Sequence, residues 1–140
     1  IFKRTRGFIL LSYYLLSILV LTLIFSFTNI TKVAKKKWKG IASFYNHKFN
    51  GRKTATGEIF SNKQLTAANN FLKLGTIVKV TNLLNGKTVV VKINDRMNKN
   101  NKRLIDLSQA AANKIGILHQ GIGKVSIEIL GPETDFLASR

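Results

Sequence analysis

The stretch TIVKVTNLLNGKTVVVKINDR, Thr76–Arg96, decides the fold class of this chain. Apolar and polar residues alternate in two runs, 76–81 and 87–93, and this period of two is typical of a half-buried β-strand. Asn85-Gly86 lies between the runs. That dipeptide is the strongest short-range hairpin signal, because both turn residues must accept a positive φ. The stretch therefore predicts an antiparallel hairpin with one apolar face.

Further short segments surround this hairpin. Gly40–Tyr45 (GIASFY) indicates a first strand, Leu65–Ala68 is short and apolar, and Lys124–Leu130 (KVSIEIL) alternates again. Asn46–Glu58 and Asn94–Arg103 are polar, so we expect loops there. Several short strands with one helix favour a small β-barrel over a βαβ sheet.

One segment of this part of the chain has a helical pattern. Leu107–Ile115 places apolar residues every four positions. Asp106 or Ser108 can cap its N-terminus, and Gly116 can end it.

An uncharged apolar segment covers Phe8–Phe27, with Lys and Arg on both sides. About 20 such residues can cross a bilayer as a helix. Trp38 is a candidate for a membrane interface. The pattern predicts the following organisation: a signal peptide or membrane anchor at 1–28, a basic linker at 29–38, the folded domain at 39–131 and a C-terminal tail at 132–140.

The composition narrows the classes of function. The chain has 23 Lys and Arg residues against 6 Asp and Glu, which fits an anionic partner or a general Lys bias. It has no cysteine, which excludes a disulfide framework, a thiolate zinc site and a cysteine nucleophile. No nucleic-acid reader motif is present, so nucleic acid is not an expected partner.

The few acids are the candidates for chemistry. Asp95 follows an apolar strand and is a candidate proton donor. The competing interpretation makes it an ion-pair partner of Arg96 or Arg103. Glu58 is either a groove residue or an ordinary exposed loop acid. Asp106 is interpreted as structural, either capping the helix or pairing with Arg103.

The segments, in this order, resemble the rare lipoprotein A family. The matching segments are GIASFY (Gly40–Tyr45), FNGRKTATGE (Phe49–Glu58), LTAA (Leu65–Ala68), LGTIVKVTNLLNGKTVVVKINDR (Leu74–Arg96), RLIDLSQAAANKIGI (Arg103–Ile117) and GKVSIEIL (Gly123–Leu130). The resemblance implies a mainly β fold, a six-stranded double-psi β-barrel of the barwin and expansin type. One or two short helices would accompany the barrel, and an N-terminal hydrophobic helix would precede it.

Members of that family act on peptidoglycan in the bacterial envelope. The resemblance implies an endolytic transglycosylase that cleaves MurNAc–GlcNAc bonds, leaves 1,6-anhydro ends and needs no cofactor. By motif, Asp95 of NDR is the implied catalytic acid/base, and Glu58 of TATGE is the second catalytic acid. The expected partners are glycan strands, the membrane through the N-terminal segment and, as further candidates, division-site proteins. The expected location is the cell envelope, either anchored in the membrane or exported.

The chain departs from the family pattern at three places. Asn69 replaces the family histidine of TAAH, Lys73 replaces a proline, and Met97 and Asn98 replace the GP of NDRGP. An asparagine can bind a sugar but cannot carry a proton near neutral pH, which favours an alternative function as a non-catalytic, expansin-like glycan-binding module. The residues expected to contact the glycan are Asn69, Arg96, Tyr45, Thr56 and Gly57.

Aromatic and histidine residues complete the set of candidates. Phe44, Tyr45 and Phe49 are either a sugar-stacking platform or core residues. His47 and His119 have no second ligand at metal spacing, so no metal site is expected.

Overall fold

The computed structural model describes residues 2–27 and 36–133, and within the first range it describes the side chains of residues 7–22. Helix α1 spans Phe2–Phe27, so the predicted N-terminal helix is present. Among the described residues, no helix is both long and apolar enough to cross a membrane. Most of the predicted linker and of the predicted tail lies outside the described residues.

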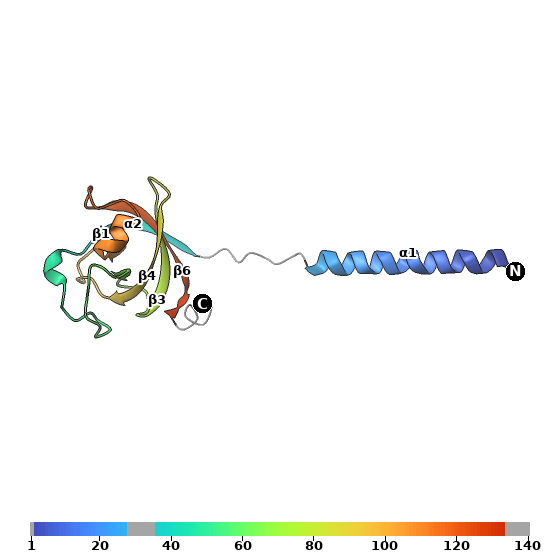
Figure 1. The fold of residues 1–140 in the computed structure, drawn as a ribbon, viewed down its shortest axis with the longest axis horizontal. Coiled ribbons are helices and arrows are strands. Elements are labelled where there is room, and N and C mark those ends of the chain that lie inside the picture. The colour runs from blue at the N-terminus through green and yellow to red at the C-terminus, as the bar shows by residue number, and fades with distance from the viewer. Residues whose placement is uncertain (1, 28–35, 134–140) are drawn as a thin grey trace. The chain divides into compact units, whose positions relative to one another are not determined.

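In residues 36–133, six strands close into a barrel in the order β1-β5-β2-β4-β3-β6. Figure 1 shows β3, β4 and β6 curving around the interior of this unit. The elements are β1 Lys37–Phe44, η1 His47–Phe49, β2 Thr66–Ala68, β3 Thr76–Asn82, β4 Thr88–Asp95, β5 Ile105–Leu107, α2 Gln109–Lys114 and β6 Gly123–Pro132. The β1–β5 and β2–β4 pairs are parallel, and the other neighbours are antiparallel. Closure gives every strand a neighbour on both sides. The predicted six-stranded barrel is therefore confirmed.

The hairpin is confirmed, but its turn differs from the prediction. Val80 of β3 pairs with Val89 of β4 in an antiparallel register. Only Gly86 of the dipeptide takes a positive φ, 73°, and Asn85 does not. The connection is a longer loop, which Asn82 at the end of β3 organises.

Asn82 explains this longer loop. Its side chain is 3% exposed. Its Oδ1 accepts from Leu84 N at 2.9 Å, and its Nδ2 donates to Ile115 O at 2.8 Å. A buried amide has to find hydrogen-bond partners, and here they lie inside the loop and at the end of α2.

The predicted helix is too long at its N-terminal side. Leu107 belongs to β5, where it pairs with Phe44 of β1 and Ala67 of β2. Ser108 is the N-cap, and its side chain accepts from Ala111 N. An apolar residue at a strand end fits either pattern, so the spacing alone could not exclude Leu107 from the helix.

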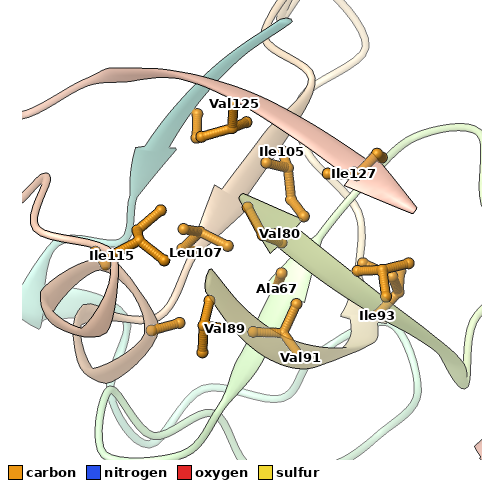
Figure 2. Packing of buried hydrophobic residues seen from close by; sticks show 14 of the residues in the cluster. Ala67, Val80, Val89, Val91, Ile93, Ile105, Leu107, Ile115, Val125 and Ile127 are labelled. Carbon is orange, nitrogen blue, oxygen red and sulfur yellow. The ribbon is translucent and has the colours of Figure 1, made fainter. Parts of the chain in front are cut away.

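The core is a cluster of small and branched apolar side chains inside the barrel (Figure 2). The labelled members are Ala67, Val80, Val89, Val91, Ile93, Ile105, Leu107, Ile115, Val125 and Ile127. Burial of one Val, Leu or Ile side chain contributes about 1.5–3 kcal/mol. All members of the cluster lie between Ala42 and Ile127, so this unit has its own core.

Strand β1 begins inside the segment that was expected to be linker. Lys37 pairs with Glu128, and Trp38 pairs with Ile127 of β6. The Trp38 ring packs against the core and against Phe71, at 5.7 Å between ring centroids. Trp38 is therefore part of the barrel.

Candidate active site

Strand register brings two acids to one end of the barrel. Ser43 of β1 pairs with Asp106 of β5, and Asp106 pairs with Ala68 of β2. Ala68 in turn pairs with Asp95 of β4. Asp95 and Asp106 come from separate parts of the sequence, yet a single strand separates them.

A β-bulge sets the direction of Asp95. Ala67 pairs with Ile93, whereas the next residue, Ala68, pairs with Asp95, so Asn94 is an extra residue in β4. Strict alternation would place Asp95 on the face that buries Ile93. A bulge re-aims the side chains that follow it. Asn94 is 2% exposed, and Asp95 is half-buried at the barrel end.

A groove of about 610 Å³ opens at this end, and we call it the Asp95 groove. Aromatic, basic and amide side chains line it together with two acids. The lining residues are Phe44, Tyr45, Asn46, Lys48, Phe49, Arg52, Lys53, Phe60, Asp95, Arg96, Met97, Asn98, Asn101, Arg103 and Asp106. A groove of this composition can hold a polar chain molecule against an acid.

Neutral donors hold the Asp95 carboxylate. The Tyr45 hydroxyl donates to Oδ2 at 2.7 Å. The backbone N–H groups of Ala55 and Arg96 donate to Oδ1 at 2.9 and 2.8 Å. The guanidinium groups of Arg96 and Arg103 donate to other acceptors, Asn69 O and the Asp106 carboxylate. The interpretation of Asp95 as an ion-pair partner of Arg96 or Arg103 is therefore wrong.

Tyr45 lies between the core and the Asp95 groove. Its ring is 4.4 Å from the Phe60 ring and 5.5 Å from the Phe49 ring, between centroids. Burial, together with the hydrogen bond to Asp95, raises the pKa of Tyr45 well above its usual 10.0. The phenol therefore stays protonated and remains a donor to Asp95.

The TATGE segment forms the turn that reaches Asp95. Gly57 takes φ 85°, a left-handed conformation that glycine adopts at no steric cost. Thr56 N donates to Asn94 O at 3.2 Å, and Ala55 N donates to the Asp95 carboxylate. The turn thus fastens to β4 beside the acid.

Glu58 closes this turn through its side chain. It forms an ion pair with Lys92 and accepts from Asn94 Nδ2 at 2.9 Å, and Lys92 also reaches Glu133 at 3.2 Å. The hydrogen bonds from Lys92 and Asn94 hold the pKa of Glu58 below its usual 4.5. Burial opposes the charge on Lys92, but the bonds to Glu58 and Glu133 outweigh burial and raise its pKa. Glu58 is not among the residues that line the groove with Asp95.

Asp106 lines the groove but is committed to an arginine. Arg103 Nε donates to Oδ1 at 2.7 Å and Nη2 donates to Oδ2 at 3.0 Å, and Asn101 adds a bond at 3.3 Å. The hydrogen bonds to Asp106 raise the pKa of Arg103. The predicted pairing with Arg103 is confirmed, whereas the capping role belongs to Ser108.

Asn69 lies in the interior, against the expected role as a sugar ligand. Its side chain is fully buried. Oδ1 accepts from Phe71 N and Leu72 N at 2.9 and 2.7 Å, and Nδ2 donates to Leu104 O at 2.8 Å. Its carbonyl accepts from the Arg96 guanidinium. These contacts give Asn69 a structural role beside the acid.

The other expected glycan contacts divide into two groups. Tyr45 and Arg96 line the Asp95 groove. Thr56 and Gly57 are exposed on the adjacent turn, outside the groove lining. Among the described residues, no group of three or more His, Cys, Asp or Glu side chains could hold a metal ion.

Sequence reasoning missed two supports of Asp95. The first is the Ala55 N–H, a backbone donor that carries no signal in the sequence. The second is Asn94, whose bulge and side-chain bond to Glu58 could have been sought in the NDR motif. Both join the turn to the end of β4.

A family model described as "Lytic transglycolase" matches residues 37–127. This chain belongs to the lytic transglycolase family. Relatives named "Endolytic peptidoglycan transglycosylase RlpA" confirm the resemblance to rare lipoprotein A. The protein from Haemophilus influenzae is 52% identical over 92 residues, which cover 66% of this chain and 32% of that protein. The protein from Neisseria meningitidis serogroup A is 42% identical over 106 residues, which cover 76% of this chain and 44% of that protein. The chain spans about a third of the length of the first relatives it matches.

Solved structures place this lytic transglycolase domain among double-psi β-barrels. The Streptomyces papain inhibitor matches with a TM-score of 0.56 at 24% identity, over 67% of this chain and 94% of the inhibitor. A point mutant of a Clavibacter michiganensis expansin, solved in complex with cellohexaose, matches with a TM-score of 0.55 at 20% identity. That match covers 68% of this chain and 50% of the expansin. The predicted double-psi β-barrel is confirmed.

Proposed function

We propose that this chain is an endolytic peptidoglycan transglycosylase that cleaves MurNAc–GlcNAc bonds and leaves 1,6-anhydro ends. The observation that carries the proposal is Asp95, an acid held by neutral donors in an open groove of a lytic transglycolase domain. The names of the relatives agree with this activity.

The reaction needs one residue to act as an acid and then as a base. Protonated Asp95 gives its proton to the glycosidic oxygen as the bond from that oxygen to C1 breaks. The 6-hydroxyl of the same muramyl ring then attacks C1, and Asp95 takes the hydroxyl proton. Asp95 ends in its initial state, and no water is consumed. Tyr45 and the two backbone N–H groups stabilise the carboxylate between the two proton transfers.

In this proposal Glu58 acts as a positioning residue. Its bonds to Lys92 and Asn94 anchor the turn whose Ala55 N–H binds Asp95. This role accounts for the position of Glu58 outside the groove lining.

The proposal extends to the cellular setting. Residues 1–28 act as a signal peptide or a membrane anchor, and the barrel acts on glycan strands in the cell envelope, in wall remodelling or with division-site proteins. Cell fractionation with a tagged chain tests the location. Recovery in the envelope fraction is expected, and recovery in the cytosol would contradict it.

A second candidate function is glycan binding without cleavage. The expansin of the same fold was solved with cellohexaose. The family histidine is also absent here, because Asn69 takes its place. Both observations fit a binding module.

Product analysis separates these functions. Purified glycan strands are incubated with the full chain, and the fragments are identified by mass spectrometry. Fragments lighter by one water than hydrolysis products carry anhydro ends and support the proposal when Asp95→Asn abolishes them. Binding without fragments supports the second function, and reducing ends formed by hydrolysis contradict the transglycosylase reaction.

A further inference from the structure

A cationic corner lies in the wall of the Asp95 groove. The Phe49 ring has Lys48 Nζ at 5.5 Å and the Arg52 guanidinium at 5.4 Å from its centroid. All three residues line the groove. Cations within about 6 Å of an aromatic centroid are attracted by the ring quadrupole. The ring therefore attracts two long, flexible cationic side chains to the same part of η1 and the loop that follows it.

The charge of this corner is uncompensated. Among residues 36–133, the ion pairs between side chains involve Lys37, Lys79, Lys92 and Arg103, and neither Lys48 nor Arg52. Lys53 also lines the groove.

The groove itself supplies little negative charge to this corner. Its two acids are Asp95 and Asp106. Asp106 is bound by both ends of the Arg103 fork. Asp95 already accepts from the Tyr45 hydroxyl and from two backbone N–H groups, and it forms no ion pair with Lys48 or Arg52. An anion from a ligand can therefore occupy the corner without displacing an internal partner.

We propose that Lys48 and Arg52, held on Phe49, form a subsite for an oxyanion carried by the glycan, either a sugar carboxylate or a sugar phosphate. The inference rests on the proposed function, because it names the substrate class of the same groove. The guanidinium offers a planar fork that binds two oxygens, and the ammonium offers a point charge. The ligand of the groove is then an acidic saccharide rather than a neutral one.

Binding measurements in an Asp95→Asn background test this subsite without turnover. The probes are a neutral N-acetylglucosamine hexamer, an alternating GlcNAc–MurNAc hexamer, the same alternating hexamer with its carboxyls converted to amides, and a phosphate-bearing saccharide. The full chain is used for every variant, so that the variants differ only at the substituted residues.

The acidic hexamer should bind about tenfold more tightly than the neutral one, because charge-assisted hydrogen bonds are stronger than neutral ones. Lys48→Gln with Arg52→Gln should abolish this preference. Lys63→Gln with Lys73→Gln, at exposed positions outside the groove, removes the same charge and should leave the preference intact. Phe49→Leu keeps both charges and should reduce the preference by releasing them. Thermal unfolding checks that each variant is folded.

The outcomes are distinct. Loss of the preference on amidation identifies the carboxylate as the ligand, and a greater affinity for the phosphate-bearing probe identifies the phosphate. Equal affinity for neutral and acidic probes, or equal loss in both double variants, overturns the subsite. Cleavage by the wild-type chain without any charge preference leaves the proposed function standing and the subsite refuted. A charge preference without cleavage supports the subsite and contradicts the proposed function.

Discussion

Asp95 and Asp106 line the same groove, one strand apart, but they have opposite surroundings. Three neutral donors, the Tyr45 hydroxyl and two backbone N–H groups, hold Asp95. The guanidinium fork of Arg103 holds Asp106 in two bonds.

The difference shows that two aspartates at the same end of the barrel can have different roles. A carboxylate with a bidentate arginine has its charge satisfied and its geometry fixed. A carboxyl group with neutral donors is oriented by them, and no cation fixes it in its ionised form. We therefore expect chemistry at Asp95 and stability at Asp106.

The largest expected effect tests this division directly. Asp95→Asn should lower kcat by about 10³-fold, because a positioned acid/base contributes roughly 10²–10⁴-fold. Asp106→Asn, the matched control in the same groove, should lower kcat by less than about tenfold. The measurement is the rate of appearance of anhydro ends, with circular dichroism to confirm folding. Similar losses of kcat in both variants would contradict separate roles for Asp95 and Asp106.

The next effect concerns the Tyr45 hydroxyl, the side-chain donor to Asp95. Tyr45→Phe keeps the ring contacts with Phe49 and Phe60 but removes the hydroxyl. It should lower kcat about tenfold with little change in KM, because the lost bond stabilises the carboxylate during the reaction. Ser43→Ala removes a hydroxyl that donates to Gly121 O, and it serves as the control. An unchanged kcat in Tyr45→Phe would show that this bond has no catalytic role.

A smaller effect is expected for the ion pair between Arg103 and Asp106. Arg103→Gln leaves the Asp106 side chain, which is 16% exposed, without its cation. The free energy of unfolding should fall by about 1–2 kcal/mol. Combination with Asp106→Asn should cost less than the sum of the two single changes, as measured by urea unfolding. Lys102→Gln, at an exposed neighbouring position, is the control. Strict additivity would mean that the pair contributes no coupling.

The smallest effect concerns the Glu58 anchor and its pH dependence. The pKa of Glu58 is lowered in the folded state, so its contribution is present above its ordinary value of 4.5 and is lost as pH falls through the lower folded pKa. The Glu58 side chain is 42% exposed, and the pair with Lys92 should contribute at most about 1 kcal/mol at neutral pH. The difference in unfolding free energy between the wild type and Glu58→Gln should shrink in acid. A difference that grows as pH falls would contradict this sign.

Much of the barrel could be predicted from local pattern. Two alternating runs predicted β3 and β4, and a third predicted β6, because one buried face imposes a period of two. β5 was missed. It spans only Ile105–Leu107, and a segment that short carries too few residues to show a period.

The site was predicted less completely. The motif predicted Asp95 and Glu58 as two acids of one site, but only Asp95 lines the groove. The pairing of Asp106 with Arg103 was predicted as one of two structural roles. Burial of Asn69 was not predicted, because an asparagine that binds three backbone groups looks the same in sequence as one that faces solvent.

The sequence by itself determined the longer strands, the family and the acid at the end of β4. Only the tertiary structure decided where that acid points. The bulge at Asn94 turns Asp95 away from the core face, and parallel pairing brings it one strand from Asp106. Alternation and motif are local properties that a chain carries in its order of residues. Register, bulges and backbone donors such as Ala55 N–H depend on which distant strand lies beside each residue, and only the closed barrel fixes that.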